Sequence, residues 1–159
     1  HMATTTFSGP LRSGPTKITS GTNVQKDMAN LGYVVLSQAV GVTQAATTAT
    51  TIIIPANSRI LSIKLYVTTI WNGVGSTAGL GFDDGTVITP AALTTAAGVA
   101  GGALGIISAT PGADQTRVQN WDNTGTTAKR IRLLSANTGT GVGTLVVDYV
   151  QAVHATVQA

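Results

Sequence analysis

Cysteine and glutamate are both absent from this chain of 159 residues, and charged residues of any kind make up only 9% of it. An ordinary soluble domain carries about 25% charged residues. The absence of cysteine excludes disulfides, thiol catalysis and thiolate metal sites, and it leaves the redox compartment undetermined. The absence of glutamate leaves a glycoside hydrolase only aspartate pairs, which the sequence alone cannot place.

Long apolar runs are also missing, since none approaches the ~18 residues that a membrane-spanning helix needs. The N-terminal stretch lacks the hydrophobic segment of a signal peptide. We therefore expect a soluble product made in the cytoplasm, with no membrane partner. The formal charge of +3 comes from nine basic residues spread over the whole chain, a pattern that does not favour a nucleic-acid partner.

Histidine is scarce, and His1 with Met2 looks like the remnant of a cleaved tag before the natural start. His154 then remains as the base for a catalytic triad. In a continuous strand Asp148 would share its face but lie about 20 Å away, so the two could not touch. No Walker-type phosphate loop is present either. These absences predict a protein that is not an enzyme and has no cofactor.

Two features that resemble sites have simpler interpretations. Asp83 and Asp84 precede Gly85, which is typical of a turn, so we predict no metal site, although a surface calcium site stays open. The basic cluster of Lys129, Arg130 and Arg132 is expected to lie on a solvated strand face, with a phosphate or acidic-partner site as the alternative.

Neutral polar residues stand where lysine and glutamate usually supply solubility, and the mean hydropathy is +0.28. Removing a hydroxyl or an amide from water costs far less free energy than removing an ion. Such a surface is therefore easily buried against other protein subunits.

Residues 1–30 contain Pro10 and Pro15, few large apolar side chains and no strand or helix periodicity, so we expect an extended N-terminal arm. About 29 stretched residues reach on the order of 100 Å, far beyond a domain of this size. Alone, such a segment would stay disordered, so it is either a gripping arm or a flexible terminus.

Residues 31–159 show short runs rich in β-branched residues between glycine, asparagine and proline turns. The expected strands are Gly32–Gln38, Thr50–Ile54, Arg59–Trp71, Gly79–Phe82, Thr86–Thr89, Leu104–Ser108, Arg117–Trp121, Lys129–Ser135 and Leu145–Val153. In the longest, Leu61, Ile63, Leu65, Val67 and Thr69 share the core face. Residues 91–103 are expected to form an irregular loop, and residues 137–143 a loose hairpin between the last two strands.

This pattern predicts an all-β fold: an antiparallel β-sandwich of jelly-roll type, although an immunoglobulin-like sandwich stays open. Strand edges have few lysines to protect them, so neighbouring subunits are expected to cover them. Trp71 and Trp121 both flank polar turns. They are expected to anchor the core or an interface, and a carbohydrate-binding role is the alternative.

Three short motifs then carry a resemblance: residues 7–14 (FSGPLRSG), 32–38 (GYVVLSQ) and 52–60 (IIIPANSRI). They resemble small virion proteins of tailed bacteriophages, namely capsid decoration or cement proteins. The resemblance implies a virion structural protein on the outer capsid surface, bound to the major capsid protein as a homo-oligomer, with a trimer favoured.

On that hypothesis the arm grips the capsid, and the candidate contact residues are Phe7, Pro10, Leu11, Arg12, Lys17 and Lys26. Arg12, Lys17 and Lys26 would face an acidic capsid surface. The alternative function is a receptor- or carbohydrate-binding head of a phage fibre, in which Trp71 or Trp121 contacts the ligand.

Overall fold

The computed structural model describes residues 12–17, 29–44, 48–72, 76–135 and 139–151. The chain divides into two units, one up to Val35 and one from Leu36 onward, and each is described by itself. In the first unit, β1 (Arg12–Lys17) pairs antiparallel with β2 (Ala29–Tyr33).

These two strands differ from the expectation that residues 1–30 have no regular structure. Backbone hydrogen bonds between strands do not require alternating apolar residues, so the pattern of apolar residues does not predict β1 and β2. The strand expected over Gly32–Gln38 is also divided, because β2 ends at Tyr33 and the next strand begins at Leu36. The arm boundary at residue 30 stays a prediction.

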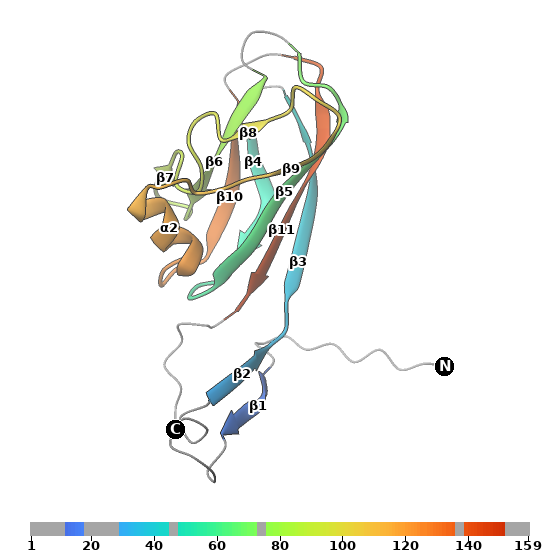
Figure 1. The fold of residues 1–159 in the computed structure, drawn as a ribbon. Coiled ribbons are helices and arrows are strands. Elements are labelled where there is room, and N and C mark those ends of the chain that lie inside the picture. The colour runs from blue at the N-terminus through green and yellow to red at the C-terminus, as the bar shows by residue number, and fades with distance from the viewer. Residues whose placement is uncertain (1–11, 18–28, 45–47, 73–75, 136–138, 152–159) are drawn as a thin grey trace, which may run out of the picture. The chain divides into compact units, whose positions relative to one another are not determined.

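The second unit is a sandwich of two antiparallel sheets, as Figure 1 shows, and the predicted all-β sandwich is confirmed. In order across the first sheet, the strands are β3 (Leu36–Thr43), β11 (Val142–Val150), β5 (Arg59–Thr69) and β9 (Gly105–Ser108). Across the second they are β4 (Thr48–Ile54), β10 (Lys129–Ser135), β6 (Thr77–Asp83) and β7 (Ile88–Thr89), with β8 (Val99–Ala100) also paired to β6.

The pairing of strands is nested along the chain. β3 pairs with β11, β4 with β10, β5 with β9, and β6 with β8. The two strands of each pair come from opposite ends of the remaining sequence, and successive pairs alternate between the sheets. The link around residues 137–143 therefore crosses from β10 in one sheet to β11 in the other. The predicted hairpin is wrong, because each of these strands finds its partners elsewhere.

The core lies between the sheets and is built from alternate residues of the central strands. It includes Ile63 and Leu65 of β5, Leu145 and Val147 of β11, Ile52 and Ile54 of β4, Leu80 of β6, and Ile131 and Leu133 of β10. Complete burial of one such side chain contributes about 1.5–3 kcal/mol, so these strands hold the sandwich closed.

The alternation along β5 is correct in the middle and wrong at both ends. Ile63, Leu65 and Val67 are buried as predicted, but Leu61 is 46% exposed and Ile60 is buried in its place. Asp148 and Tyr149 on β11 pair with Ser62 and Ile60, so Leu61 is an extra residue on β5. Such a bulge reverses which face the following side chains occupy. A second bulge falls near Thr68 and leaves Thr69 exposed.

The strand expected at Arg117–Trp121 is instead part of a helix, α2 (Gln115–Asp122). The Asp114 side chain caps its first turn by accepting a hydrogen bond from the Arg117 N–H at 2.9 Å. Arg117, Asn120 and Trp121 share one helix face, from which they donate to the carbonyl oxygens of residues 91, 92 and 93. These contacts hold residues 91–93 of the segment over residues 91–103 that was predicted to be an irregular loop. The segment also contains the short strand β8, which was not predicted.

Candidate functional site: outer faces of the two sheets

Two members of the basic cluster, Arg130 and Arg132, lie on the outer face of the second sheet, on strand β10. Ile131 and Leu133 point inward and are fully buried, whereas Arg130 and Arg132 point outward and are partly exposed. The predicted division of β10 into a core face and a basic face is confirmed. Each outward residue therefore lies between β4 on one side and β6 on the other.

Two of the three cations have carboxylate partners in the turn after β6. Lys129 Nζ lies 3.2 Å from Asp84 Oδ2, and Arg132 Nη1 lies 3.1 Å from Asp83 Oδ2. The other oxygen of each aspartate accepts backbone hydrogen bonds: Asp83 from Gly85, and Asp84 from Thr86 and Val87. The prediction that these aspartates shape a turn is confirmed.

The same contacts control the ionisation of Asp84. The backbone N–H groups of Val87 and Thr86, followed by Lys129, lower the pKa of Asp84 to about 2. The carboxylate thus stays charged at any physiological pH. Gly85 continues the turn with φ +90°, a conformation that suits glycine.

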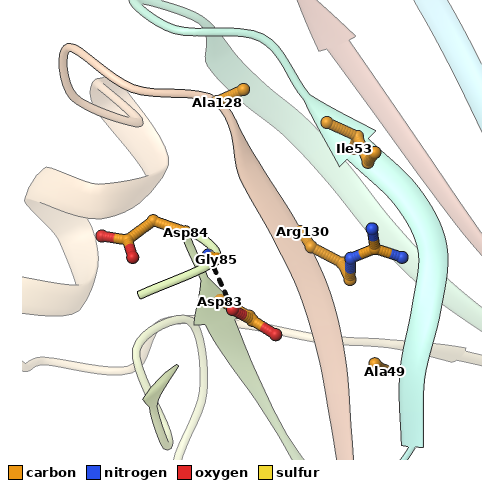
Figure 2. A pocket seen from close by; sticks show the side chains of 7 residues that line it. All are labelled: Ala49, Ile53, Asp83, Asp84, Gly85, Ala128 and Arg130. Carbon is orange, nitrogen blue, oxygen red and sulfur yellow. Dashed lines mark hydrogen bonds between the residues drawn. The ribbon is translucent and has the colours of Figure 1, made fainter. Parts of the chain in front are cut away.

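Arg130 is the cation without a carboxylate partner among the residues described here. Its Nη1 donates to the Thr50 carbonyl oxygen at 3.0 Å, which holds the guanidinium toward β4. Figure 2 shows the side chain beside a hollow of about 480 Å³ lined by Ala49, Ile53, Asp83, Asp84, Gly85, Ala128 and Arg130. Sequence analysis grouped Arg130 with its neighbours, because no local signal separates a paired cation from an unpaired one.

The outer face of the first sheet is nearly free of charge. Its outward side chains in the described strands include Ser37, Ala39 and Thr43 of β3, Val142, Thr144, Val146 and Asp148 of β11, Leu61, Ser62, Lys64, Tyr66 and Thr68 of β5, and Ile106 and Ser108 of β9. Lys64 and Asp148 are the charged members of this set, and their charges cancel. We call these residues the neutral face. Arg59, at the start of β5, is paired with Asp122 of α2.

Asp148 is anchored within the neutral face. Ser62 Oγ donates to its carboxylate at 2.6 Å. Hydrogen bonds from Ser62 and Ser37, with a smaller contribution from Lys64, lower the pKa of Asp148. His154, which sequence analysis weighed as its catalytic partner, lies outside the described residues. The hydrogen bonds of Asp148 are therefore those of a carboxylate with a structural role.

Trp71 lies just after β5 and is 1% exposed, so its ring has no free face for a sugar. Gly101 and Gly141 touch the ring closely, and a Cβ on either glycine would overlap it. The neighbouring Gln44 binds the Asn72 backbone through both ends of its amide. Trp71 is a core residue in this unit.

Trp121 is partly buried and packs against the core from α2. Its Nε1 donates to the Leu93 carbonyl oxygen at 2.9 Å, so the indole fastens the helix to the loop over residues 91–103. The scarcity of tryptophan predicted a core or interface role for Trp121, whereas a strand was predicted where this helix lies.

The predicted arm contacts are only partly within the described residues. Arg12 and Lys17 are the first and last residues of β1, opposite Tyr33 and Ala29. Phe7, Pro10, Leu11 and Lys26 lie outside the described residues. Their roles stay predictions.

The described residues contain no group of three or more His, Cys, Asp or Glu side chains that could hold a metal ion. Among them there is also no helix long and apolar enough to cross a membrane.

Comparisons with known proteins give little more. No protein-family model matches the chain, and no curated protein matches it. One solved structure, "Cyanophage Pam1 capsid asymmetric unit", contains a chain similar to it, with a TM-score of 0.40 and 17% sequence identity over 84% of this chain and 99% of that chain. A likeness of this size assigns neither a family nor a function.

Proposed function

We propose that this protein is a non-enzymatic structural component of a tailed-phage virion, a decoration protein that binds the outer capsid shell as an oligomer. The observation that carries this proposal is the neutral face: the outer side of a sheet on which the charged side chains Lys64 and Asp148 have opposite sign, while Arg59 at the start of β5 is paired with Asp122. The resemblance of residues 7–14, 32–38 and 52–60 to decoration proteins supplies the biological context.

The neutral face suits burial against other protein. It exposes apolar groups, including Ile106 at 60% and Val142 at 40%, among hydroxyl groups that are cheap to desolvate. Fully buried interface cores are likewise depleted in charge. A face of this kind is therefore suited to contact with another copy of the chain or with the capsid.

The nested strand pairing supports the jelly-roll type of sandwich within this proposal. A jelly roll forms when a long antiparallel ribbon wraps so that the first strand pairs with the last, the second with the next to last, and so inward. The pairs β3·β11, β4·β10, β5·β9 and β6·β8 follow that rule. A jelly roll presents two broad sheet faces, one for each kind of neighbour in a shell.

In the proposed mechanism, many weak contacts between the oligomer and the capsid add up to firm attachment. Each copy contributes a sheet face and an N-terminal arm, and linkage of several copies multiplies weak contacts into firm attachment. In the arm, Phe7, Pro10 and Leu11 would supply apolar contacts. Arg12, Lys17 and Lys26 would pair with acidic groups of the major capsid protein.

Truncation tests the arm. A chain that begins at Leu36 removes the whole first unit without cutting any strand of the sandwich. We expect it to keep its circular dichroism spectrum and thermal transition but to lose co-sedimentation with capsids that lack the protein. Co-sedimentation equal to that of the full chain would remove the arm from the proposal.

The oligomer is tested separately by light scattering after size exclusion. We expect a particle with three times the mass of one 16.0 kDa chain. A monomer at all accessible concentrations that also fails to bind capsids would overturn the proposed function.

A further inference from the structure

The hollow beside Arg130 has the features of a binding site for a single carboxylate group. It lies on the outer face of the second sheet and takes its lining from β4, the end of β6 with its turn, and β10 with the residue before it. Its volume of about 480 Å³ lies within the range of small-ligand sites. Three of its lining residues, Ala49, Gly85 and Ala128, are small, and they leave the space open.

The charges around the hollow do not balance. Lys129, Arg130 and Arg132 face Asp83 and Asp84, so this part of the sheet carries one positive charge more than negative ones. The two ion pairs already occupy both aspartates, whose remaining oxygens accept backbone N–H groups. The uncompensated charge is that of Arg130.

The position of Arg130 is fixed before any ligand arrives. In the ladder it lies opposite Ile53 on β4 and Asp83 on β6. One of its five N–H donors bonds the Thr50 carbonyl oxygen, which orients the planar guanidinium. The remaining donors have no protein partner among the described residues. A guanidinium held in this way loses little side-chain entropy when it binds a carboxylate in a bidentate manner.

The remaining walls select the class of anion. Ile53 is 43% exposed and offers an apolar wall beside the guanidinium. A dianion such as phosphate would meet the two aspartates with only one uncompensated cation, whereas a monoanion would match it. From this geometry we infer that the hollow binds one carboxylate flanked by apolar groups, brought by an extended segment of a partner protein. This inference does not depend on the virion role.

Two sources can supply such a carboxylate, an acidic side chain or the C-terminus of a chain. The probes are therefore acetyl-leucyl-glutamyl-leucyl-amide and acetyl-leucyl-leucine with a free C-terminus. The neutral control is acetyl-leucyl-glutaminyl-leucyl-amide, and inorganic phosphate is the dianion control. Binding is followed by amide chemical shifts of the labelled full-length protein.

We expect at least one carboxylate peptide to shift the amides of Ile53, Gly85 and Arg130 with a Kd near or below about 1 mM. The glutaminyl peptide should bind at least about tenfold more weakly, because it cannot form the charge-assisted pair. Whichever carboxylate peptide binds more tightly identifies the source. Equal binding of the glutamyl and glutaminyl peptides, tighter binding of phosphate, or no shift at about 10 mM peptide would overturn the inference.

Variants locate the site. Arg130→Gln should remove carboxylate binding, whereas the control Arg59→Gln, which changes a cation paired with Asp122 outside the hollow, should leave it unchanged. Ala128→Phe keeps Arg130 and fills the hollow from an exposed position, so it should weaken binding at least about tenfold and gives a second test if Arg130→Gln does not fold. Unchanged binding in Ala128→Phe would exclude the hollow.

Discussion

At the scale of single residues, two glycines pack closely against the Trp71 ring. A Cβ at Gly101 or Gly141 would overlap its ring, so Gly101→Ala or Gly141→Ala should lower the free energy of unfolding by about 1–3 kcal/mol. Gly41→Ala is the matched control, because nothing lies within 4 Å of its Cβ. Urea denaturation measures all three. Equal stability of the three variants would show that the Trp71 pocket is loosely packed.

Asp84 makes a second residue-scale prediction, on pH. Its pKa falls from 3.8 to about 2 on folding, so the folded state binds its proton less readily than the unfolded chain. The stabilisation is present above about pH 4 and is lost as the pH falls through about 2. Carboxyl-detected NMR should give a midpoint near 2 for Asp84. A midpoint near 3.8 would mean that the Val87, Thr86 and Lys129 contacts do not persist in solution.

At the scale of elements, α2 depends on its cap. Asp114→Ala removes the acceptor for the Arg117 N–H and should cost about 1 kcal/mol of stability, whereas Asp114→Ser keeps an acceptor and should cost much less. The difference in urea midpoint measures the cap directly. If the alanine and serine variants unfold together, the side-chain bond contributes nothing to the helix.

The elements also show what a sequence can and cannot predict. Strand β10 was predicted over the same residues, because Ile131 and Leu133 alternate with charged neighbours. The register shift between Arg130 and Arg132 adds its extra residues to β4, so the alternation along β10 is intact. In β5 the bulge at Leu61 reverses the alternation, and it is visible only from the pairing with β11. Helix α2 carried a signal that was passed over: Asp114 as a cap, followed by the helical spacing of Arg117, Asn120 and Trp121.

At the scale of the whole molecule, the strand order and the candidate sites could not be predicted from the sequence, for one physical reason. Both depend on which strands become neighbours, and that is set by packing between distant segments. The unpaired state of Arg130 exists only because Asp83 and Asp84 turn toward Arg132 and Lys129 across the β6–β10 pair. The composition predicts that the protein carries few charges. Which surface has the fewest charges depends on how the strands are arranged into two sheets, and this cannot be predicted from the composition.

The neutral face itself can be tested with one added charge. Thr144 lies on the central strand β11, opposite Gly41 and Tyr66, so Thr144→Glu places an unpaired carboxylate in the middle of the face. If the face is buried on assembly, desolvating that charge should weaken self-association or capsid binding at least about tenfold. Thr126→Glu adds the same charge at an exposed position between α2 and β10 and should change neither.

Thr126→Glu, at an exposed position, should unfold within about 0.5 kcal/mol of the parent chain, and Thr144→Glu, at a partly exposed position, within about 1 kcal/mol. Sedimentation velocity measures the association, and co-sedimentation with capsids measures the attachment. A Thr144→Glu protein that assembles and binds as the parent does would mean that the neutral face stays in solvent. The scarcity of charge on it would then have no role in assembly, and the second sheet with the arm would have to supply every contact.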